Sequence, residues 1–412
     1  MLRSASPATP ASIEPSPPSA TPIPSAWVPP AVPAGAGWHL LPGTPMDPPL
    51  TWAYTYESTV TRFDGLDILI GDREDPGIWF SGDGVRWEAA DGIDFREDPD
   101  GEELAVVGLA TNGTELVAFG DHWSEATQER AAVLWRSIDG RTWTRVVDPA
   151  FHPGVYVGFV GATSRGFVAF GFDATAPDDP RAARGWTSND GSTWQPIASE
   201  IASAVQPGLQ LLTGIDGVLT AFTNADQVVG PLEVWQAARD DLASWQRVGS
   251  FEGSESMGYL SVAKGPGGWL AIGAGIYRSI DGRAWSPAFD PSGPGSPEYP
   301  TTPIALVGDD AGFIATTAVP TGDGCVASGL QGMTWVSPDG VTWQRLPVDR
   351  QFENATIFGL ISRAGVVIGL GWSDDDKGAE SAIWLAERAT LVGGADPMPS
   401  PGAASSGGCG PG

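Results

Sequence analysis

The sequence predicts an all-β fold, a seven-bladed β-propeller of four-stranded antiparallel blades whose ring is closed by an N-terminal strand. Three observations predict it: a hairpin motif that recurs along the chain, an apolar run that precedes each copy of the motif, and the composition. The 412 residues include 55 Gly, 37 Pro and 18 Trp, and only 17% are charged. Such a composition suits many short strands joined by tight turns, and a regular repeat favours one ring of similar units over several unrelated domains.

The hairpin motif begins with an aromatic residue, which is followed two positions later by Ser. One further residue separates this Ser from an Asp-Gly pair, and the motif ends in a Trp three positions after the Gly. Five complete copies occur: Trp79–Trp87, Trp135–Trp143, Trp186–Trp194, Tyr277–Trp285 and Trp335–Trp343. A degenerate copy runs from Trp235 to Trp245, and a half copy begins at Trp384. The seven leading aromatic residues predict seven blades.

The residues of the motif suit a tight turn between two antiparallel strands. Gly adopts a positive φ at little cost, and the Asp carboxylate accepts hydrogen bonds from backbone N–H groups of the turn. The closing Trp is expected to pack its ring against the base of the hairpin. We therefore assign a structural role, in preference to a catalytic or metal-binding one, to the motif aspartates: Asp83, Asp139, Asp190, Asp281 and Asp339.

An apolar segment that starts after a turn glycine precedes every motif, as in GLDILIG from Gly65 and GFVAFG from Gly166. Seven such segments occur, which repeats the count of blades. The last repeat lacks its outer strand after Trp384, whereas GWHLLP from Gly37 resembles TWQRLP from Thr342. Residues 37–42 are therefore expected to pair antiparallel with the strand around residues 382–386 and so to cover an otherwise open strand edge.

The two ends of the sequence differ from the repeats. Residues 1–36 form a Ser/Thr/Pro-rich stretch that predicts a disordered stalk, residues 37–390 form the propeller, and residues 391–412 are expected to be a disordered tail. Such stalks favour a place outside the cytoplasm, secreted or tethered to a surface, although no export signal is visible. No apolar run approaches the roughly 18 residues needed to span a bilayer, so we predict no membrane span.

The charge balance excludes one class of partner. The chain has 50 acidic and 22 basic residues, a formal net charge of −28, which disfavours binding to the phosphate backbones of nucleic acids. The two cysteines, Cys325 and Cys409, give neither a disulfide framework nor a cysteine zinc site, and whether they pair stays open. His39, His122 and His152 have no metal-ligand spacing, so no metal site and no cofactor is predicted.

The hairpins resemble the Asp-box (BNR) repeats of the sialidase-like propellers, with one residue fewer between Asp and Gly than in the commonest form. The resemblance covers most of residues 37–390 and implies a fold better than an activity, because such propellers include glycosidases, receptors and assembly factors. A sialidase would need a Phe-Arg-Ile-Pro-like segment and three arginines that converge on the substrate carboxylate. The sequence has no such segment, and most of its arginines lie in or beside the hairpins.

Our functional hypothesis is a non-catalytic extracytoplasmic binding or assembly propeller, and the alternative is a sialidase-like glycoside hydrolase. The strand order places the hairpins on one side of the disc and the long loops on the other, where acidic residues gather. We expect a monomer whose ligand, a protein or a glycan, binds this acidic loop face, with a divalent cation as a further candidate. The residues that we expect to carry it are Asp98, Asp100, Glu102, Glu103, Asp374, Asp375 and Asp376.

Overall fold

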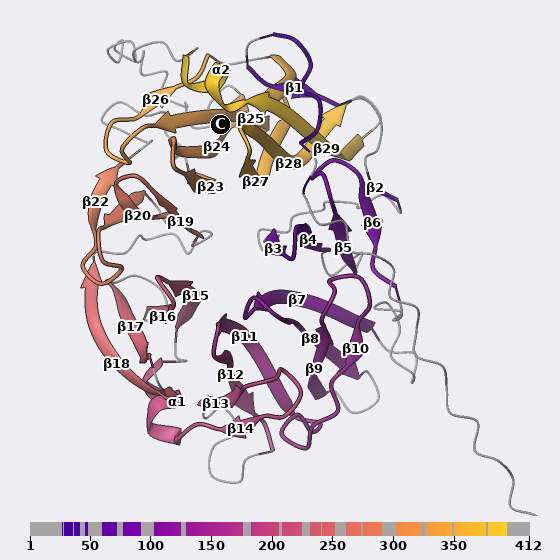
Figure 1. Ribbon diagram of the computed structural model, residues 1–412, viewed down its shortest axis with the longest axis vertical. Coiled ribbons are helices and arrows are strands. Elements are labelled where there is room, and N and C mark those ends of the chain that lie inside the picture. Colours follow the sequence, from indigo (N-terminus) through magenta and orange to yellow (C-terminus); the bar gives the residue numbers. More distant parts are fainter. Residues whose placement is uncertain are drawn as a thin grey trace, which may run out of the picture.

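A computed structural model gives the fold of the protein. It describes residues 27, 29–35, 37–41, 46–47, 60–71, 77–91, 103–124, 129–175, 183–205, 208–224, 231–239, 241–251, 261–272, 275–290, 302–322, 327–347, 350–375 and 378–393. Most of these residues form antiparallel sheets that follow one another around a ring (Figure 1). The described helices are short: α1 (Ser199–Val205), α2 (Arg388–Gly393) and the 3₁₀ turn η1 (Arg350–Phe352).

Five sheets are separate from one another and of blade size. The first contains β3 (Thr61–Phe63), β4 (Leu66–Ile70), β5 (Ile78–Ser81) and β6 (Trp87–Ala89), with β2 (Met46–Asp47) parallel to β6. The second contains β7 (Glu103–Thr111), β8 (Leu116–Ser124), β9 (Glu129–Ser137) and β10 (Thr144–Arg145). The third contains β11 (Val155–Thr163), β12 (Gly166–Asp173), β13 (Ala183–Ser188) and β14 (Gln195–Pro196). The fourth contains β15 (Leu209–Ile215), β16 (Val218–Thr223), β17 (Leu232–Ala238) and β18 (Asp241–Phe251), and the fifth β19 (Ser261–Gly265), β20 (Gly268–Ile272), β21 (Ile276–Ser279) and β22 (Ser286–Phe289).

The remaining strands belong to one eight-stranded sheet. One antiparallel group in it contains β23 (Thr302–Asp309), β24 (Gly312–Gly322), β25 (Ala327–Ser337) and β26 (Gln344–Arg345). The other contains β27 (Ala355–Arg363), β28 (Val366–Asp375), β29 (Gly378–Glu387) and β1 (His39–Leu40). A parallel pairing of β25 with β27, Gln331 opposite Ala355, joins the two groups. The predicted count of seven separate blades is therefore wrong: the described chain has five, because this bridge merges the other strands into a single larger sheet.

The predicted pairing of the N-terminal strand with the end of the chain is confirmed. In β1, His39 lies opposite Leu385 and Leu40 opposite Trp384 of β29, in antiparallel register. The neighbouring Trp38 is buried, and its indole Nε1 donates a hydrogen bond to Thr334 Oγ1 at 3.1 Å. The first strand in sequence thus becomes the outermost strand of the last sheet, beside β29 (Figure 1).

The hairpin turns make the hydrogen bonds that their residues predict. In the second sheet, Asp139 Oδ1 accepts the backbone N–H groups of Arg141 and Thr142 at 2.9 and 2.8 Å, while Ser137 Oγ accepts that of Gly140 at 2.9 Å. The closing tryptophans are buried, between 2% and 7% exposed, as expected: Trp87, Trp143, Trp194, Trp245, Trp285 and Trp343. The degenerate copy keeps part of this turn, since Asp241 Oδ1 accepts the N–H of Ala243.

The turn glycine has a second role that the sequence did not reveal. Gly140 has φ +72°, and a Cβ there would lie 2.8 Å from Ile68 Cδ1 of the preceding sheet. At Gly84 a Cβ would lie 2.3 Å from Ile368 Cδ1, which brings the first sheet against the last. The hairpin glycine is therefore needed both for the turn and for close packing between neighbouring sheets.

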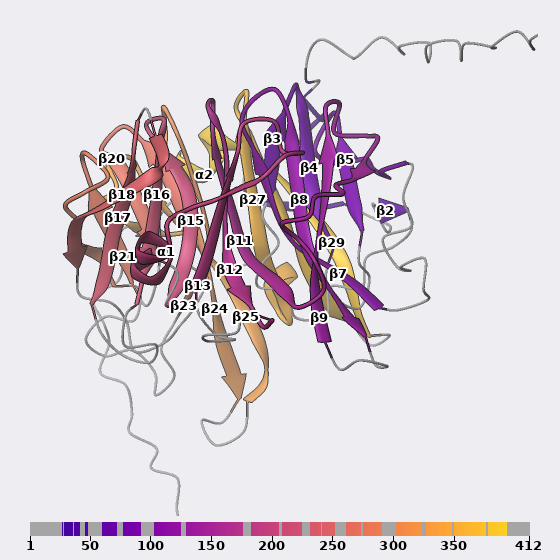
Figure 2. The ribbon, with the colours of Figure 1, turned by 90° about the horizontal axis from the view of Figure 1, so that it is seen from below.

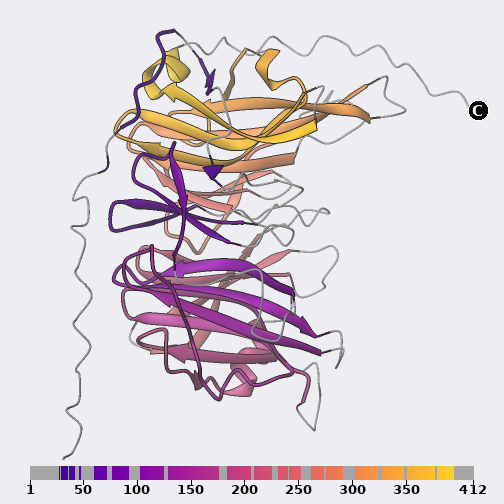
Figure 3. The same cartoon turned by 90° about the vertical axis from the view of Figure 1, so that its right-hand side faces the viewer.

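The ring has two distinct faces, which the side views separate (Figures 2 and 3). Because the four consecutive strands of each group run antiparallel, the turns from first to second strand and from third to fourth strand share one side, here named the hairpin face. The connections from second to third strand, and from one sheet to the next, share the other side, here named the loop face.

Candidate functional site

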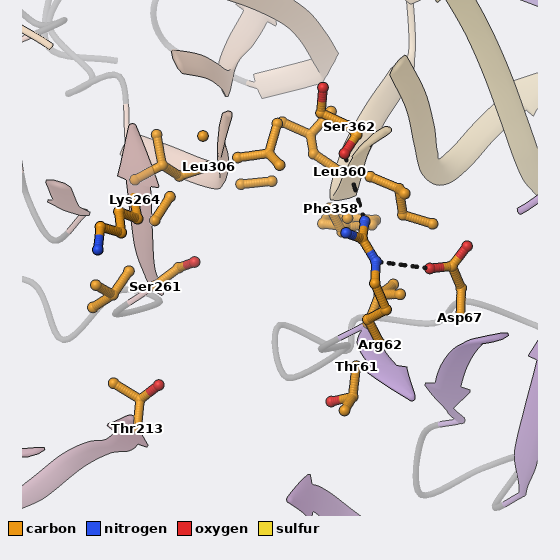
Figure 4. Close-up of a pocket in the computed structure, with 18 of the residues that line it drawn as sticks. Thr61, Arg62, Asp67, Thr213, Ser261, Lys264, Leu306, Phe358, Leu360 and Ser362 are labelled. Carbon is orange, nitrogen blue, oxygen red and sulfur yellow. Dashed lines mark hydrogen bonds and ion pairs between the residues drawn. The ribbon is translucent and has the colours of Figure 1, made fainter. Parts of the chain in front are cut away.

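A cavity of about 550 Å³ lies where the innermost strands of the ring meet. Its walls come from β3, β7, β15, β19, β23 and β27. Alternate residues of a strand point to the same side, so Phe358, Leu360 and Ser362 of β27 line the cavity together. Hydroxyl groups of Thr61 and Thr213 are added from other strands, which gives the wall a mixed apolar and polar character (Figure 4).

Two of the charged groups of the cavity wall, Arg62 and Asp67, lie together at the side of β3. Arg62 Nε lies 3.8 Å from Asp67 Oδ1, and the Arg62 guanidinium donates a hydrogen bond to the backbone carbonyl of Ser362 at 3.5 Å (Figure 4). Asp67 is 1% exposed, whereas the Arg62 side chain is 52% exposed. The arginine is thus oriented by a carboxylate from its own sheet and a carbonyl from the last sheet.

The environment of Asp67 disfavours its charged form. Burial raises the pKa of this carboxyl above the ordinary value of 3.8, and the Arg62 and Arg363 guanidinium groups oppose the rise only in part. Asp67 Oδ2 is buried and has no hydrogen-bond partner of normal geometry among the described residues. A carboxyl of this kind holds its proton more firmly than an exposed aspartate does.

A second polar group lies across the cavity from Arg62, where β19 meets the turn after β15 (Figure 4). The Lys264 ammonium binds Asp216, and Trp269 Nε1 donates to Asp216 Oδ2 at 3.1 Å. Lys264 also lies 5.3 Å from the centre of the Trp269 ring. These contacts link the fourth sheet to the fifth, and the Lys264 ammonium is paired with the Asp216 carboxylate.

The cavity wall continues into a chain of contacts on the hairpin face. Ser362 donates a hydrogen bond to Asp309 Oδ2, and Asp309 Oδ1 accepts one from Arg388 at 3.2 Å. Arg388 is 6% exposed, and burial lowers its pKa from the ordinary arginine value.

Among the described residues that line the cavity, Asp67 is the single carboxylate and Arg62 the single arginine. Neither a carboxylate pair nor three convergent arginines is therefore present in this part of the wall. Within the described part of the chain, no group of three His, Cys, Asp or Glu side chains is placed to hold a metal ion.

The predicted acidic loop face falls largely outside the described residues. Asp98, Asp100, Glu102 and Asp376 lie there, as do Cys325 and Cys409. Glu103 begins β7, and Asp374 and Asp375 end β28, so the backbone places these three at strand ends on the loop face. Whether their side chains gather in one site stays a prediction.

The five motif aspartates occupy hairpin turns, where Oδ1 of each accepts turn N–H groups. The sequence analysis missed Arg62 and Asp67. One signal pointed to the second of them: Asp67 interrupts the apolar segment LDILI, whose other members are all buried.

No helix in the described part of the chain combines the length and apolar character that a membrane crossing requires.

No family model matches the chain, and no curated protein matches it. Solved structures do resemble it. A Trypanosoma rangeli sialidase mutant that displays trans-sialidase activity has a TM-score of 0.40 and 12% identity, over 82% of this chain and 54% of its own. The endosialidase of phage phi92 has a TM-score of 0.43 and 11% identity, over 85% of this chain and 69% of its own. The GH93 α-L-arabinofuranosidase of Fusarium graminearum has a TM-score of 0.40 and 10% identity, over 85% of this chain and 96% of its own.

The chain thus spans about half the length of the trypanosomal sialidase. These neighbours are sialidase-type and GH93-type β-propellers, and at 10 to 12% identity the likeness is one of fold alone.

Proposed function

We propose that the protein is a non-catalytic binding or assembly propeller that acts outside the cytoplasm and presents an acidic loop face to a cationic partner. The observation that supports the proposal most is the acidic sequence of the connection between the first two sheets, whose ends lie on the loop face. On the hairpin face, Arg136 binds Glu115 and the Asp190 carbonyl, Arg278 binds the Gly267 carbonyl, and Arg363 binds the Gly65 carbonyl. Cations of the described chain are thus held by turns on that side.

A connection that begins and ends on the loop face is rich in acidic residues. The connection from the first to the second sheet has six acidic residues and one arginine between positions 92 and 103. It leaves and rejoins the ring on the loop face, because β6 ends there and β7 begins there. A surface of one sign attracts oppositely charged partners and speeds their association.

The test uses a fluorescently labelled Lys-rich peptide as the probe, with Ca²⁺ alone in a second titration. The variant Asp98→Asn, Asp100→Asn, Glu102→Gln, Glu103→Gln should bind the peptide more weakly, and binding to the natural chain should weaken as salt rises, because ions screen exposed charges. A control removes three carboxylates from the hairpin face: Asp64→Asn, Asp310→Asn and Glu387→Gln. Equal loss of binding in both variants, or binding indifferent to salt, contradicts the proposal.

A glycoside hydrolase is the second candidate, and Asp67 is the observation that favours it. A carboxyl with a raised pKa in a cavity is suited to donate a proton to a leaving group. The described cavity wall offers no second carboxylate to assist it, so we expect no release of sialic acid from a fluorogenic sialoside. Turnover of a sialoside or an arabinofuranoside that Asp67→Asn abolishes would favour the hydrolase instead.

A further inference from the structure

The N-terminal segment before β1 packs onto the hairpin face through one aromatic side chain. Trp27 is 9% exposed and belongs to the same apolar cluster as Leu69, Trp79 and Ile361, which come from the first and the last sheets. Val32 packs against this cluster as well. Both residues lie in the segment predicted to be a stalk, so that segment contacts the ring at these two positions.

The Trp27 ring lies against an arginine that the β3–β4 turn holds in place. The Arg363 guanidinium carbon is 4.9 Å from the ring centre, and Arg363 Nη1 donates a hydrogen bond to the Gly65 carbonyl at 3.4 Å. Stacking of this kind favours an electron-rich aromatic ring, and indole most of all. The group formed by Arg363, Asp67 and the apolar cluster around Leu69 is named the indole seat.

Asp67 adds a polar element to the indole seat. Trp27 lies close enough to the carboxyl to lower its pKa against the effect of burial, which is the larger influence. Even so, Trp27 Nε1 and Asp67 Oδ2 are both buried without a hydrogen-bond partner of normal geometry. The seat therefore offers an acceptor to an aromatic N–H donor, and the present occupant does not satisfy it fully.

Apart from Trp27 and Val32, most described residues of the segment are exposed. A cavity of about 750 Å³ is bounded on one side by Pro30 and Val32 and on the other by the β27–β28 turn and Arg388. The intervening Ala31 and the following Pro33 are exposed. Trp27 is thus the main anchor of a segment that is otherwise poorly packed, which is the condition under which a tethered ligand exchanges.

We propose that the indole seat is a binding site for a tryptophan-bearing, proline-rich segment, filled here by the protein's own Trp27 and open to exchange with the same segment of a second copy. When Trp27 leaves, Asp67 at the edge of the central cavity becomes accessible from the hairpin face. The proposal is independent of the acidic loop face.

The test uses the full chain with Trp27→Ala and N-acetyltryptophanamide as the probe. The probe should raise the melting temperature of this variant and protect Asp67 from modification by a carbodiimide, while the natural chain responds weakly because its own indole occupies the seat. N-acetylphenylalaninamide, which lacks the indole N–H donor, should bind about tenfold more weakly, a difference of about 1.4 kcal/mol. Adding Arg363→Gln should abolish the response to the probe.

If Trp27→Ala does not fold, Trp27→Phe keeps a ring in the seat. A labelled peptide of residues 25–34 should then bind Trp27→Phe better than the natural chain, and the same peptide with Ala in place of Trp should not bind. The variant Ala31→Ser, which changes an exposed residue of the same segment, serves as the control. Equal binding of both peptides, or equal response to the two amino-acid amides, overturns the proposal.

Discussion

Aspartate has two opposite roles in this protein, and the surroundings of each carboxyl decide which. Partial burial would raise the pKa of Asp139, but hydrogen bonds from the Thr142 and Arg141 backbone hold it below the ordinary value. At Asp67 burial is the largest influence, and the neighbouring arginines and Trp27 oppose it only in part, so its pKa is raised. The folded state therefore favours the charged form of the first carboxyl and the neutral form of the second.

Replacing Asp67 by Asn should change how stability depends on pH. A raised pKa means that the folded protein retains a proton that the unfolded chain releases, so stability falls as pH rises from about 4 through the raised pKa. Asp67→Asn should remove this fall, which urea unfolding at a series of pH values measures as the difference from the natural chain. The exposed Asp64→Asn is the control, and a difference curve independent of pH would contradict the assignment.

Substitution of two glycines with positive φ distinguishes the backbone cost of the turn from the cost of packing between sheets. Gly113 has φ +93° and open space around a Cβ, whereas Gly140 has φ +72° and would place a Cβ 2.8 Å from Ile68. Gly113→Ala should cost about 1 to 2 kcal/mol in free energy of unfolding for the backbone alone. Gly140→Ala should cost about 1 to 3 kcal/mol more for overpacking between sheets. Equal costs in urea unfolding would show that the contact between the sheets relaxes freely.

At the scale of elements, the short strand β1 joins the two ends of the chain. It pairs with β29 by only two residues, but Trp38 and the Gln351 side chain extend the junction, since Gln351 Nε2 donates to the Trp38 carbonyl at 2.8 Å. Trp27 and Val32 of the preceding segment pack against the indole seat. The junction therefore depends on a strand, a buried indole and an extended segment together.

Truncation should separate these contributions. Deletion of residues 1–42 removes β1 and Trp38, and should lower the melting temperature strongly or cause aggregation through the uncovered edge of β29. The sequence alone predicts that deletion of residues 1–34 is harmless; because Trp27 is buried, we now expect a smaller but measurable loss. Trp38→Ala in the full chain should cost about 3 to 5 kcal/mol. Equal melting temperatures for both truncations would refute the closure by β1.

At the scale of the whole molecule, a formal net charge of −28 acts against the compact state through repulsion between like charges. Added salt should therefore raise the melting temperature, since the screening length shortens from about 30 Å at 0.01 M to about 8 Å at 0.15 M. The variant that loses four loop-face carboxylates should show a smaller rise than the natural chain. A rise of the same size in both would mean that the loop face contributes little to the repulsion.

The sequence by itself determined the all-β class, the hairpin turns and the pairing of β1 with β29. These depend on local rules: Ser, Asp and Gly at fixed offsets specify a turn within nine residues, and a missing strand at one end matches a spare strand at the other. The motif aspartates could be assigned for the same reason, because their hydrogen-bond partners lie two and three residues away.

Only the tertiary structure decided how the sheets join and what surrounds the cavity. The bridge from Gln331 to Ala355 that merges two groups of strands, and the contact of Gly84 with Ile368, connect residues with no shared local pattern. The site at Asp67 is built from Arg62 of the first sheet, Arg363 of the last and Trp27 of the N-terminal segment. An Asp in an apolar run indicates that other side chains surround its carboxyl, but the sequence does not say which ones. They are determined by closure of the ring, because closure brings chain segments about 300 residues apart into contact.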